Sequence, residues 1–347
     1  MNQNLTKELL YNLQTLMSKT FNDKDYHQVC RCLLDYLGCA FAGTYILKNK
    51  LHKIIEISGT SSEGSFPVGM KMNLAPETAA LINGISSHVA EMDDGVRFGM
   101  IHPGAPIFSA LLPVAYKFNV SGEDLIRGVL VGYDAAIRLA MAIQPSHYNL
   151  GYHPTATCGS IGAAMGVAAM LSFTINEMET ALAAASISAA GSLKVIEDSS
   201  ELKPYNVGHA AALAVQAATI GKAGFNPPND SLNGNTGFLK MNSEIINSKV
   251  LLEPSPNNYW IHSTYIKPYA ACRHAHPSIE GVLEILKKQL FKPSEITKIS
   301  ITTYGGLLGR HDNQAVSNFA SAKMSIPFSI AIAINSGSVG INDFNQN

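Results

Sequence analysis

The hydrophobic and polar positions of this chain follow a helical period through most of residues 1–250. Residues 25–43 begin with polar side chains and continue into apolar residues three and four positions apart, a spacing that predicts a helix. Pro76 is typical of the first position of a helix, and the acidic residues that follow Ser121 suit a helix N-terminus. Segments 159–171, 177–190 and 208–223 are rich in Ala and Gly, which predicts helices that pack closely.

The pattern changes near residue 251. Pro254, Pro256, Asn257 and Asn258 interrupt the helical period. Beyond them, residues 278–288 have the pattern of an amphipathic helix, and residues 296–304 alternate with many β-branched side chains, as in a strand. We therefore expect a mainly α protein with a large all-helical domain at residues 1–264 and a smaller α+β domain at residues 265–347.

Composition supports a large buried interior. The chain has 347 residues, of which 46% are hydrophobic and 15% are charged, so two domains are expected. The formal net charge of -1 and the lack of a basic run give no indication of nucleic-acid binding. Residues 139–176 carry no Lys, Arg, Asp or Glu, but Pro145 and Pro154 interrupt them, which favours a buried helix over a membrane span.

The cysteines indicate a reducing compartment. There are five, an odd number at low density, and no basic segment followed by an apolar run opens the chain as a secretory signal would. We expect reduced thiols and a cytoplasmic protein.

The first block with candidate chemistry is acidic. Glu91, Asp93 and Asp94 lie within four positions, and His102 follows in a His-Pro-Gly turn. Such a trio is costly to place together unless it is solvated, paired or functional. A helix end with its carboxylates in water is the simple alternative, but the rigid turn at His102 can present an imidazole and favours a site.

Two further blocks each place a polar side chain at the start of a small-residue helix. His153 and Thr155 precede the Ala/Gly-rich segment 159–171, and backbone N–H groups at such a start bind anions. The glycines of that segment do not have the dinucleotide-binding spacing, so no nicotinamide site is expected. Lys203 before Pro204 is ordinarily a solvated loop residue, but here it also opens a helix.

The fourth block extends from Lys267 to Pro277 and crowds basic side chains at the expected domain boundary. Arg273 can hold a carboxylate with two parallel hydrogen bonds. His274 and His276 could be zinc ligands if Asp93 or His102 completed the set, but no cysteine pair does so and we expect no metal. The chain also lacks a Gly-x-Ser-x-Gly elbow, a P-loop and a Cys-x-x-Cys pair.

These four blocks in this order resemble the MmgE/PrpD family. Further matches are residues 33–40, Gly224-Phe225, residues 237–239 and residues 322–328. The family includes 2-methylcitrate dehydratases, cis-aconitate decarboxylases and an iminodisuccinate epimerase. The resemblance implies a helical domain with an α+β lid, a homodimer, and an active site between the domains that uses no metal or organic cofactor.

The resemblance also implies the site residues and the substrate. We expect a di- or tricarboxylate substrate and a lyase similar to 2-methylcitrate dehydratase; a cis-aconitate-type decarboxylase, an iminodisuccinate-type epimerase and a non-catalytic binding protein are the alternatives. Negative charge must develop beside a carboxylate, which calls for cations around the substrate and groups that exchange protons. The expected catalytic residues are Asp93, His102, His153, Lys203 and His276, and the expected substrate-binding residues are Glu91, Asp94, Thr155, Tyr269, Arg273 and His274.

The chain departs from the family in three respects. Glu91 stands where the decarboxylase pattern has Asp, Gly95 where it has Thr, and Phe328 where a lid tyrosine is common. Family members are also longer, and their C-terminal part returns to complete the helical domain. On this basis we expect a shortened chain whose lid is incomplete and whose helical domain lacks its last helices. The apolar faces that those helices would cover, among them faces of segments 159–171, 177–190 and 208–223, would be bare, so the chain should aggregate or depend on a partner subunit.

Overall fold

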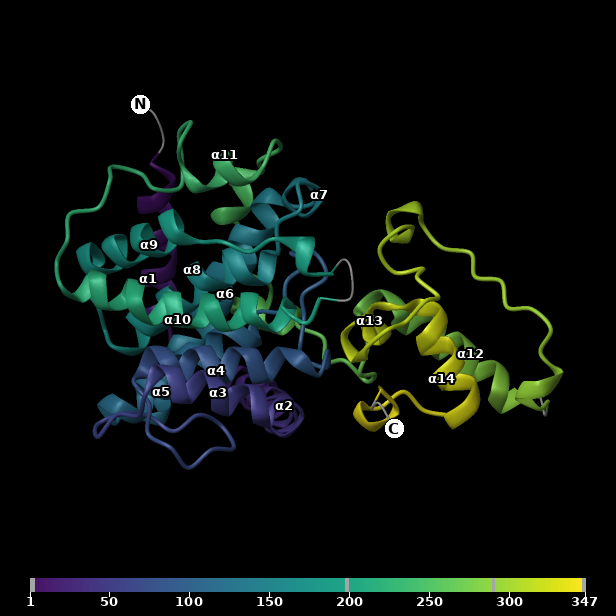
Figure 1. Ribbon diagram of the computed structural model, residues 1–347. Helices are drawn as coiled ribbons and strands as arrows, with labels where there is room; N and C mark the ends of the chain where they lie inside the picture. The colour runs from purple at the N-terminus through teal and green to yellow at the C-terminus, as the bar shows by residue number, and fades with distance from the viewer. Residues whose placement is uncertain (1–3, 197–199, 289–290, 345–347) are drawn as a thin grey trace. The chain divides into compact units, whose positions relative to one another are not determined.

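The chain folds into two compact units. The structure is a computed structural model that describes residues 4–196, 200–288 and 291–344 (Figure 1). Unit 1 consists of Met1–Val89, Asp93–Leu193 and Pro204–Ile266, and unit 2 consists of Ala90–Met92, Lys194–Lys203 and Lys267–Asn347. Each unit is a separate cluster of contacts, so each is described by itself.

Unit 1 is built from helices. Several begin with a side-chain cap: Asn22 and Thr174 form capping boxes, and Ser121 accepts a hydrogen bond from the Asp124 N–H. Helix α10 begins at Lys203, which belongs to unit 2, and its remaining residues belong to unit 1. The helices are α1 (Leu5–Ser18), α2 (Asp23–Ile46), α3 (Lys48–Ser58), α4 (Pro76–Val89), α5 (Gly104–Phe118), α6 (Gly122–Ile143), α7 (Ser146–Asn149), α8 (Pro154–Met170), α9 (Ile175–Ser188), α10 (Lys203–Lys222) and α11 (Phe238–Asn242).

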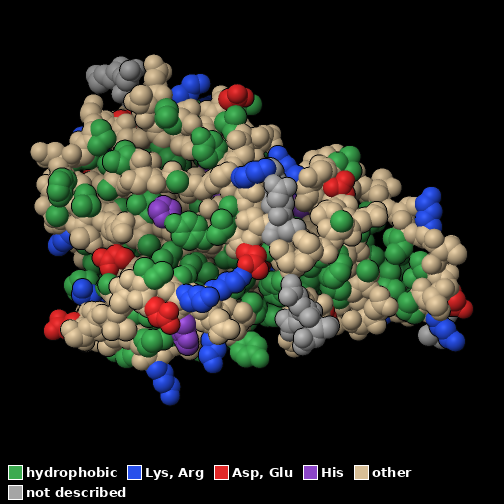
Figure 2. Space-filling model, viewed as in Figure 1, with side chains coloured by type: hydrophobic (Ala, Val, Ile, Leu, Met, Phe, Trp, Pro, Cys, Tyr) green, Lys and Arg blue, Asp and Glu red, His purple; other side chains and the backbone are tan. Residues whose placement is uncertain are grey.

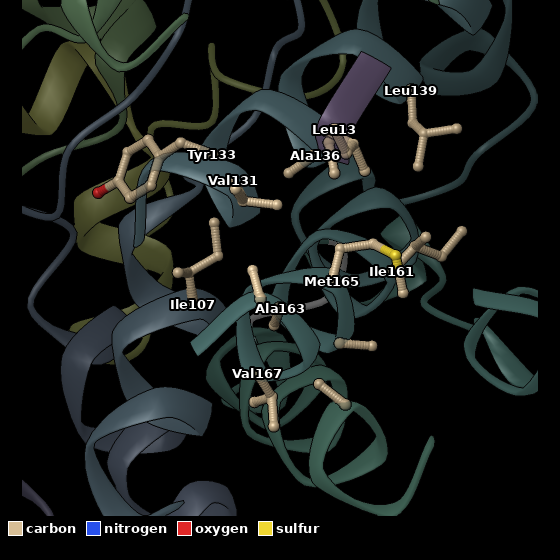
Figure 3. Close-up of a cluster of buried hydrophobic side chains, with 14 of the residues drawn as sticks. Leu13, Ile107, Val131, Tyr133, Ala136, Leu139, Ile161, Ala163, Met165 and Val167 are labelled. Atoms are coloured by element: carbon tan, nitrogen blue, oxygen red, sulfur yellow. The ribbon is translucent and has the colours of Figure 1, made fainter. Parts of the chain in front are cut away.

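Helix α8 is the centre of unit 1. Every residue of α8 is buried, and it packs most extensively against α6, with α5 and α9 on other sides. Figure 3 shows apolar side chains of α5, α6 and α8 meeting in this core, among them Ile107, Val131 and Met165. Glycine allows the close approach, since a Cβ on Gly162 would lie 2.4 Å from the Ala136 Cβ.

The charge-free segment 139–176 lies in this core. It forms the end of α6, all of α7 and α8, and the start of α9, and most of its side chains are buried. Among the described helices, only α2 has the length and hydropathy of a membrane span, with a window mean of 1.2. Its buried residues, including Val29 and Tyr36, belong to the core of unit 1, and α2 packs against α4, α5 and α6. A helix that packs into a protein core can have the same length and hydropathy as a membrane span, so these two properties alone do not indicate one.

Unit 2 has a smaller core. Its α-helices are α12 (His276–Lys288), α13 (Phe319–Met324) and α14 (Ile326–Ser336), and α12 packs against α14. Ile279, Leu307 and Ile330 are among the buried side chains that hold these elements together. Short 3-10 helices occur in both units, at Leu193–Ile196, Ser248–Leu251, Pro256–Asn258, Trp260–Ser263, Arg273–Ala275, Pro293–Glu295, Gly305–Leu307 and Ile341–Phe344.

The expected strand at residues 296–304 does not form. These residues are irregular and mostly exposed, and the described chain contains isolated bridge pairs but no extended strand. The physical reason is that a β-branched segment becomes a strand only when another segment pairs with it, and no described segment does. The mainly α fold is confirmed, whereas the β part expected in residues 265–347 is wrong for the described residues.

The surface reflects the low content of charge. On the face drawn in Figure 2, charged side chains are scattered and hydrophobic side chains lie between them. Exposed apolar residues include Leu34, Phe41 and Tyr45, all on α2.

Candidate active site

The acidic block directly follows the C-terminus of α4. Glu91, Asp93 and Asp94 are all buried, with exposed fractions of 5%, 2% and 2%. The simple alternative of a solvated helix end is therefore wrong. Glu91 has a left-handed backbone with a φ of 56°, which is uncommon for a residue with a side chain and often marks functional sites. Three buried carboxyl groups require partners, and each has a different set.

Asp93 pairs with His88. The Nδ1 of His88 lies 2.7 Å from Oδ2 of Asp93, and the His88 side chain is fully buried. A carboxylate accepts the Nδ1–H proton, so the lone pair of a neutral His88 is on Nε2. That nitrogen is buried and makes no hydrogen bond within the described part of the chain. The arrangement is that of an oriented imidazole, because the bond to Asp93 fixes the ring and its tautomer.

His102 lies on the loop before α5. Its Nδ1 donates to the Asp94 carbonyl oxygen at 2.6 Å, and its backbone N–H donates to the Thr155 hydroxyl at 3.1 Å. Asp93 lies 4.0 Å from the same imidazole. The bond at Nδ1 leaves Nε2 as the acceptor nitrogen. Thr155 is fully buried and holds the His102 backbone, and the substrate contact expected of it stays a prediction.

His153 completes a group of three imidazoles in unit 1. It occupies the position before the first turn of α8, where its backbone N–H donates to the Gly191 carbonyl oxygen. The ring centroid of His88 lies 5.4 Å from that of His102 and 5.7 Å from that of His153. The Asn206 amide lies 3.4 Å from the His153 Nδ1. We call His88, His102 and His153 the histidine cluster.

Asp94 supports the histidine cluster. Its Oδ2 accepts the Tyr133 hydroxyl at 2.7 Å and its Oδ1 accepts the Gly104 N–H at 3.0 Å. Burial raises the pKa of Asp94 to about 8, with a further contribution from Asp35. With these bonds Asp94 fixes the loop that carries His102, and the substrate-binding role expected of it stays a prediction.

Unit 2 contains the third carboxyl group of the block. The Lys203 ammonium donates to the Glu91 carboxylate, and the Lys267 Nζ lies 3.7 Å from its other oxygen. The Lys203 side chain is 12% exposed and that of Lys267 is fully buried. Lys203 is therefore a largely buried partner of Glu91 and not the solvated loop residue of the simple alternative. An ammonium has three donors, so Lys203 can contact Glu91 and an anion together.

The other expected residues of unit 2 lie near the start of α12. His276 is 3% exposed, and its Nε2 donates to the Ala271 carbonyl oxygen at 3.0 Å. The Tyr269 ring meets it edge-on at 5.2 Å, and burial lowers the pKa of His276 to about 4. Arg273 is exposed. His274 turns instead toward Tyr304 and His311.

The structure thus groups the expected residues into two sets. Unit 1 contains Asp93, Asp94, His102, His153 and Thr155, and unit 2 contains Glu91, Lys203, Tyr269, Arg273, His274 and His276. The expectation that residues from both sets line one cleft stays a prediction.

Sequence reasoning did not select three residues that the geometry brings forward. His88 is the base partner of Asp93, Lys267 is the second cation at Glu91, and the Tyr265 hydroxyl lies beside Gly95. His88 and Lys267 belong to sequence blocks that were already singled out. A titratable side chain in such a block is the signal by which they could have been selected. Nothing in the pattern around Tyr265 distinguishes it.

Comparison with known proteins identifies the family. The model of the MmgE/PrpD N-terminal domain matches residues 13–247, and that of the MmgE/PrpD C-terminal domain matches residues 269–347. The chain belongs to the MmgE/PrpD family. The resemblance expected from the four sequence blocks is confirmed.

Three relatives of this MmgE/PrpD chain are named cis-aconitate decarboxylase. The human protein is 29% identical over 218 residues, which cover 60% of this chain and 44% of that protein. One from Aspergillus terreus strain NIH 2624 / FGSC A1156 is 25% identical, covering 74% and 55%, and another from Aspergillus terreus is 26% identical, covering 72% and 54%. The chain spans about half the length of these curated relatives.

Two departures from the decarboxylase pattern have a structural setting in this family member. A Cβ on Gly95 would lie 2.4 Å from the Tyr265 hydroxyl oxygen, so that hydroxyl occupies the space a threonine side chain would need. Gly95 and Tyr265 also pair through their backbones. Phe328 is half-buried near Phe344 and has no hydroxyl to offer.

Proposed function

We propose that this chain is a lyase that removes a carboxyl group from a small unsaturated tricarboxylate such as cis-aconitate. The observation that carries the proposal is the Asp93–His88 pair within the histidine cluster, since it combines an oriented imidazole with two more imidazoles in a buried setting. The names of the relatives favour decarboxylation over the dehydration that the sequence alone suggested.

The proposed reaction is balanced by one proton. The bond between a carboxylate carbon and its neighbour breaks, carbon dioxide leaves, and the electron pair stays on the remaining fragment. That fragment then takes a proton. A protonated imidazole of the histidine cluster supplies it, and the Asp93 carboxylate stabilises the charge that such a proton brings to His88. We assign proton transfer to the histidine cluster. His102 is its most accessible member, with a side chain that is 16% exposed.

The substrate also requires cations for its carboxylates. Unit 2 offers Lys203, Lys267 and the exposed Arg273, and Glu91 orients the two lysines. Ammonium and guanidinium groups bind carboxylates through charge-assisted hydrogen bonds. In this proposal the cations of unit 2 bind the substrate carboxylates. We also propose that the protein is a homodimer in the cytoplasm, as expected from the sequence.

Dehydration of a 2-methylcitrate-like substrate is the second candidate. It is favoured by the departures at Glu91, Gly95 and Phe328, which replace three residues of the decarboxylase pattern. Dehydration needs one group to remove a C–H proton and another to protonate the departing hydroxyl, and a cluster of several imidazoles can provide both.

Product analysis distinguishes the candidates. The purified chain is incubated in heavy water with cis-aconitate, 2-methylcitrate, citrate or iminodisuccinate, and the products are identified by nuclear magnetic resonance. The proposal predicts carbon dioxide from cis-aconitate and one solvent deuterium on a carbon of the product. An unsaturated product from 2-methylcitrate without carbon dioxide supports dehydration instead, and no turnover of any of the four by folded protein contradicts both.

A further inference from the structure

A second group of potential ligands lies in unit 2, close enough to Lys203 to feel its charge. Cys272, His274 and His311 each offer a donor atom, and these three atoms lie within 4.8 Å of one another. Sulfur and imidazole nitrogen are the donors that zinc prefers, and zinc sites with three protein ligands keep a fourth position for water. We propose that Cys272, His274 and His311 bind one zinc ion.

His311 is prepared for this role by its hydrogen bonds. Its side chain is 3% exposed, and Nδ1 donates to the Met324 carbonyl oxygen at 3.0 Å. The lone pair is therefore on Nε2, which is buried and interacts with the Cys272 side chain. A metal ion between the two would replace the thiol proton as the partner of both donor atoms. Zinc-binding histidines commonly use their other nitrogen in this way, with a backbone carbonyl as partner.

His274 faces the same point and has its own outer partner. Its ring centroid lies 5.1 Å from that of His311, with an angle of 36° between the ring planes. The Tyr304 hydroxyl is hydrogen-bonded to Nδ1 of His274. This bond fixes the ring and leaves Nε2 as the nitrogen that would bind zinc. Tyr304 follows the irregular segment 296–303, so zinc would also fix the end of that segment.

The backbone holds the first and third ligands to one short stretch. The Cys272 N–H donates to the Lys323 carbonyl oxygen at 2.9 Å, and the Ile326 N–H donates to the His311 carbonyl oxygen at 2.8 Å. The His311 Nδ1 also donates to the Met324 carbonyl oxygen. These three hydrogen bonds attach both ligands to the junction of α13 and α14. Ligands positioned on fixed elements need little rearrangement to bind an ion.

The site differs from the zinc alternative weighed for the sequence. His276 does not belong to this group, because the donor atoms that lie within 4.8 Å of one another are those of Cys272, His274 and His311. The partner of His274 is His311, which is distant in sequence and was not a candidate. The site lies outside the histidine cluster, although the charge of Lys203 acts on its ligands. Metal binding is therefore measured by absorption and not by activity, so that its failure can be told from failure of the proposed function.

Cobalt binding tests the site directly, because Co²⁺ takes zinc positions and its bond to thiolate gives a near-ultraviolet absorption. Titration of the metal-free chain with CoCl2 is expected to reach one equivalent with this absorption, and ZnCl2 should remove it. Cys272→Ser should abolish the absorption, and His311→Ala should weaken binding by about 100-fold or more, beyond the roughly 10- to 100-fold typical of losing an outer partner. Tyr304→Phe should show that smaller, outer-partner effect.

Cys30→Ser is the matched control, since Cys30 is an exposed thiol of unit 1 and should leave the absorption unchanged. Zinc should also raise the melting temperature of the wild type and of Cys30→Ser but not of Cys272→Ser, because a ligand stabilises only the state it binds. Absence of the thiolate absorption in folded wild-type protein overturns the proposal. Its persistence in Cys272→Ser overturns it equally.

Discussion

Asp94 is a buried carboxyl group whose ionisation opposes folding. Its ordinary pKa of 3.8 rises to about 8 in the folded chain because burial penalises the charge, so the folded state keeps a proton that the unfolded state has lost. Its contribution to stability is full below 3.8 and is lost as the pH rises toward 8. The groups that act on it are Tyr133, Asp35, Asp93 and the Gly104 N–H.

Asp94→Asn should therefore flatten the pH dependence of unfolding. The wild type is expected to lose up to about 1.4 kcal/mol per pH unit between these two pKa values from this group, and the variant should not. Urea titrations at a series of pH values measure the slopes. His147, whose pKa burial lowers to about 4, destabilises both proteins equally as the pH falls below its ordinary 6.5. Parallel slopes for the two proteins between pH 6.5 and pH 8 would show that Asp94 is ionised in the fold.

Lys203→Met should abolish turnover and also reduce stability. Loss of a cation from the substrate site is expected to lower the rate by roughly 100-fold or more. The expectation of a solvated lysine gave a stability cost of about 0–1 kcal/mol, but the largely buried contact with Glu91 raises it to about 1–3 kcal/mol, with Lys267 as the remaining partner.

Lys222→Met is the matched control for this substitution. Lys203 and Lys222 are the first and last residues of α10. Lys222 pairs with Glu177 at 2.9 Å, but its side chain is 62% exposed. Activity assays and chemical denaturation should show near-normal rate and a change of less than about 1 kcal/mol. Equal activity of the two variants would reduce Lys203 to a structural residue.

At the scale of single residues, the sequence identified residue types and not their partners. Asp93 stood out as one of three carboxylates within four positions, and His102 and His153 stood out because each precedes a proline. Asp93 pairs with His88 across the turn that follows α4, which depends on the local backbone. Asp94 is occupied by Tyr133 from α6, which depends on how distant helices pack. Periodicity holds no information about such contacts.

Helix contact through glycine is the main feature at the scale of elements. Gly162 of α8 lies against α6 so closely that a Cβ would be 2.7 Å from the Gly132 carbonyl oxygen. Gly38 of α2 has nothing within 4 Å of the same position. Both are helical, so they share the intrinsic penalty of glycine and differ only in packing.

Gly162→Ala and Gly38→Ala should consequently have opposite effects. The first is expected to destabilise the chain by about 1–3 kcal/mol through overpacking, and the second to stabilise it by about 0.4–1 kcal/mol. Thermal and urea unfolding of both variants provide the measurement. A stable Gly162→Ala protein would mean that α6 and α8 are farther apart than described.

Helices were predictable from the sequence where the period was long and caps were present, as in α4 and α6. The sequence predicted a strand at residues 296–304 that does not form. An alternating pattern shows which side chains a paired strand would have, but it cannot supply the segment with which that strand must pair. The sequence favoured a buried helix over a membrane span for segment 139–176, and the segment is apolar because the core of unit 1 surrounds it.

For the whole molecule, the two units differ in the size of their cores. Unit 1 has a large core centred on α6 and α8 and a smaller one between α3 and α4, whereas unit 2 depends on a few short helices. Hydrogen exchange measured by mass spectrometry should find the strongest protection in α6 and α8 and the fastest exchange in residues 296–303, which make no backbone hydrogen bonds to a partner segment among those described. Comparable protection of residues 296–303 would indicate pairing that the fold does not show.

The most direct test of the proposed function is the rate of carbon dioxide release from cis-aconitate by the wild type and by His102→Gln. His102 is positioned by Asp94 and Thr155 and is the most exposed of the three imidazoles, so its loss should remove proton transfer while the buried core stays intact. Release by the wild type, and a decrease of about 100-fold or more in a variant with a normal melting curve, is the predicted result. Equal rates for the two proteins, or no release by folded wild type, would contradict the account.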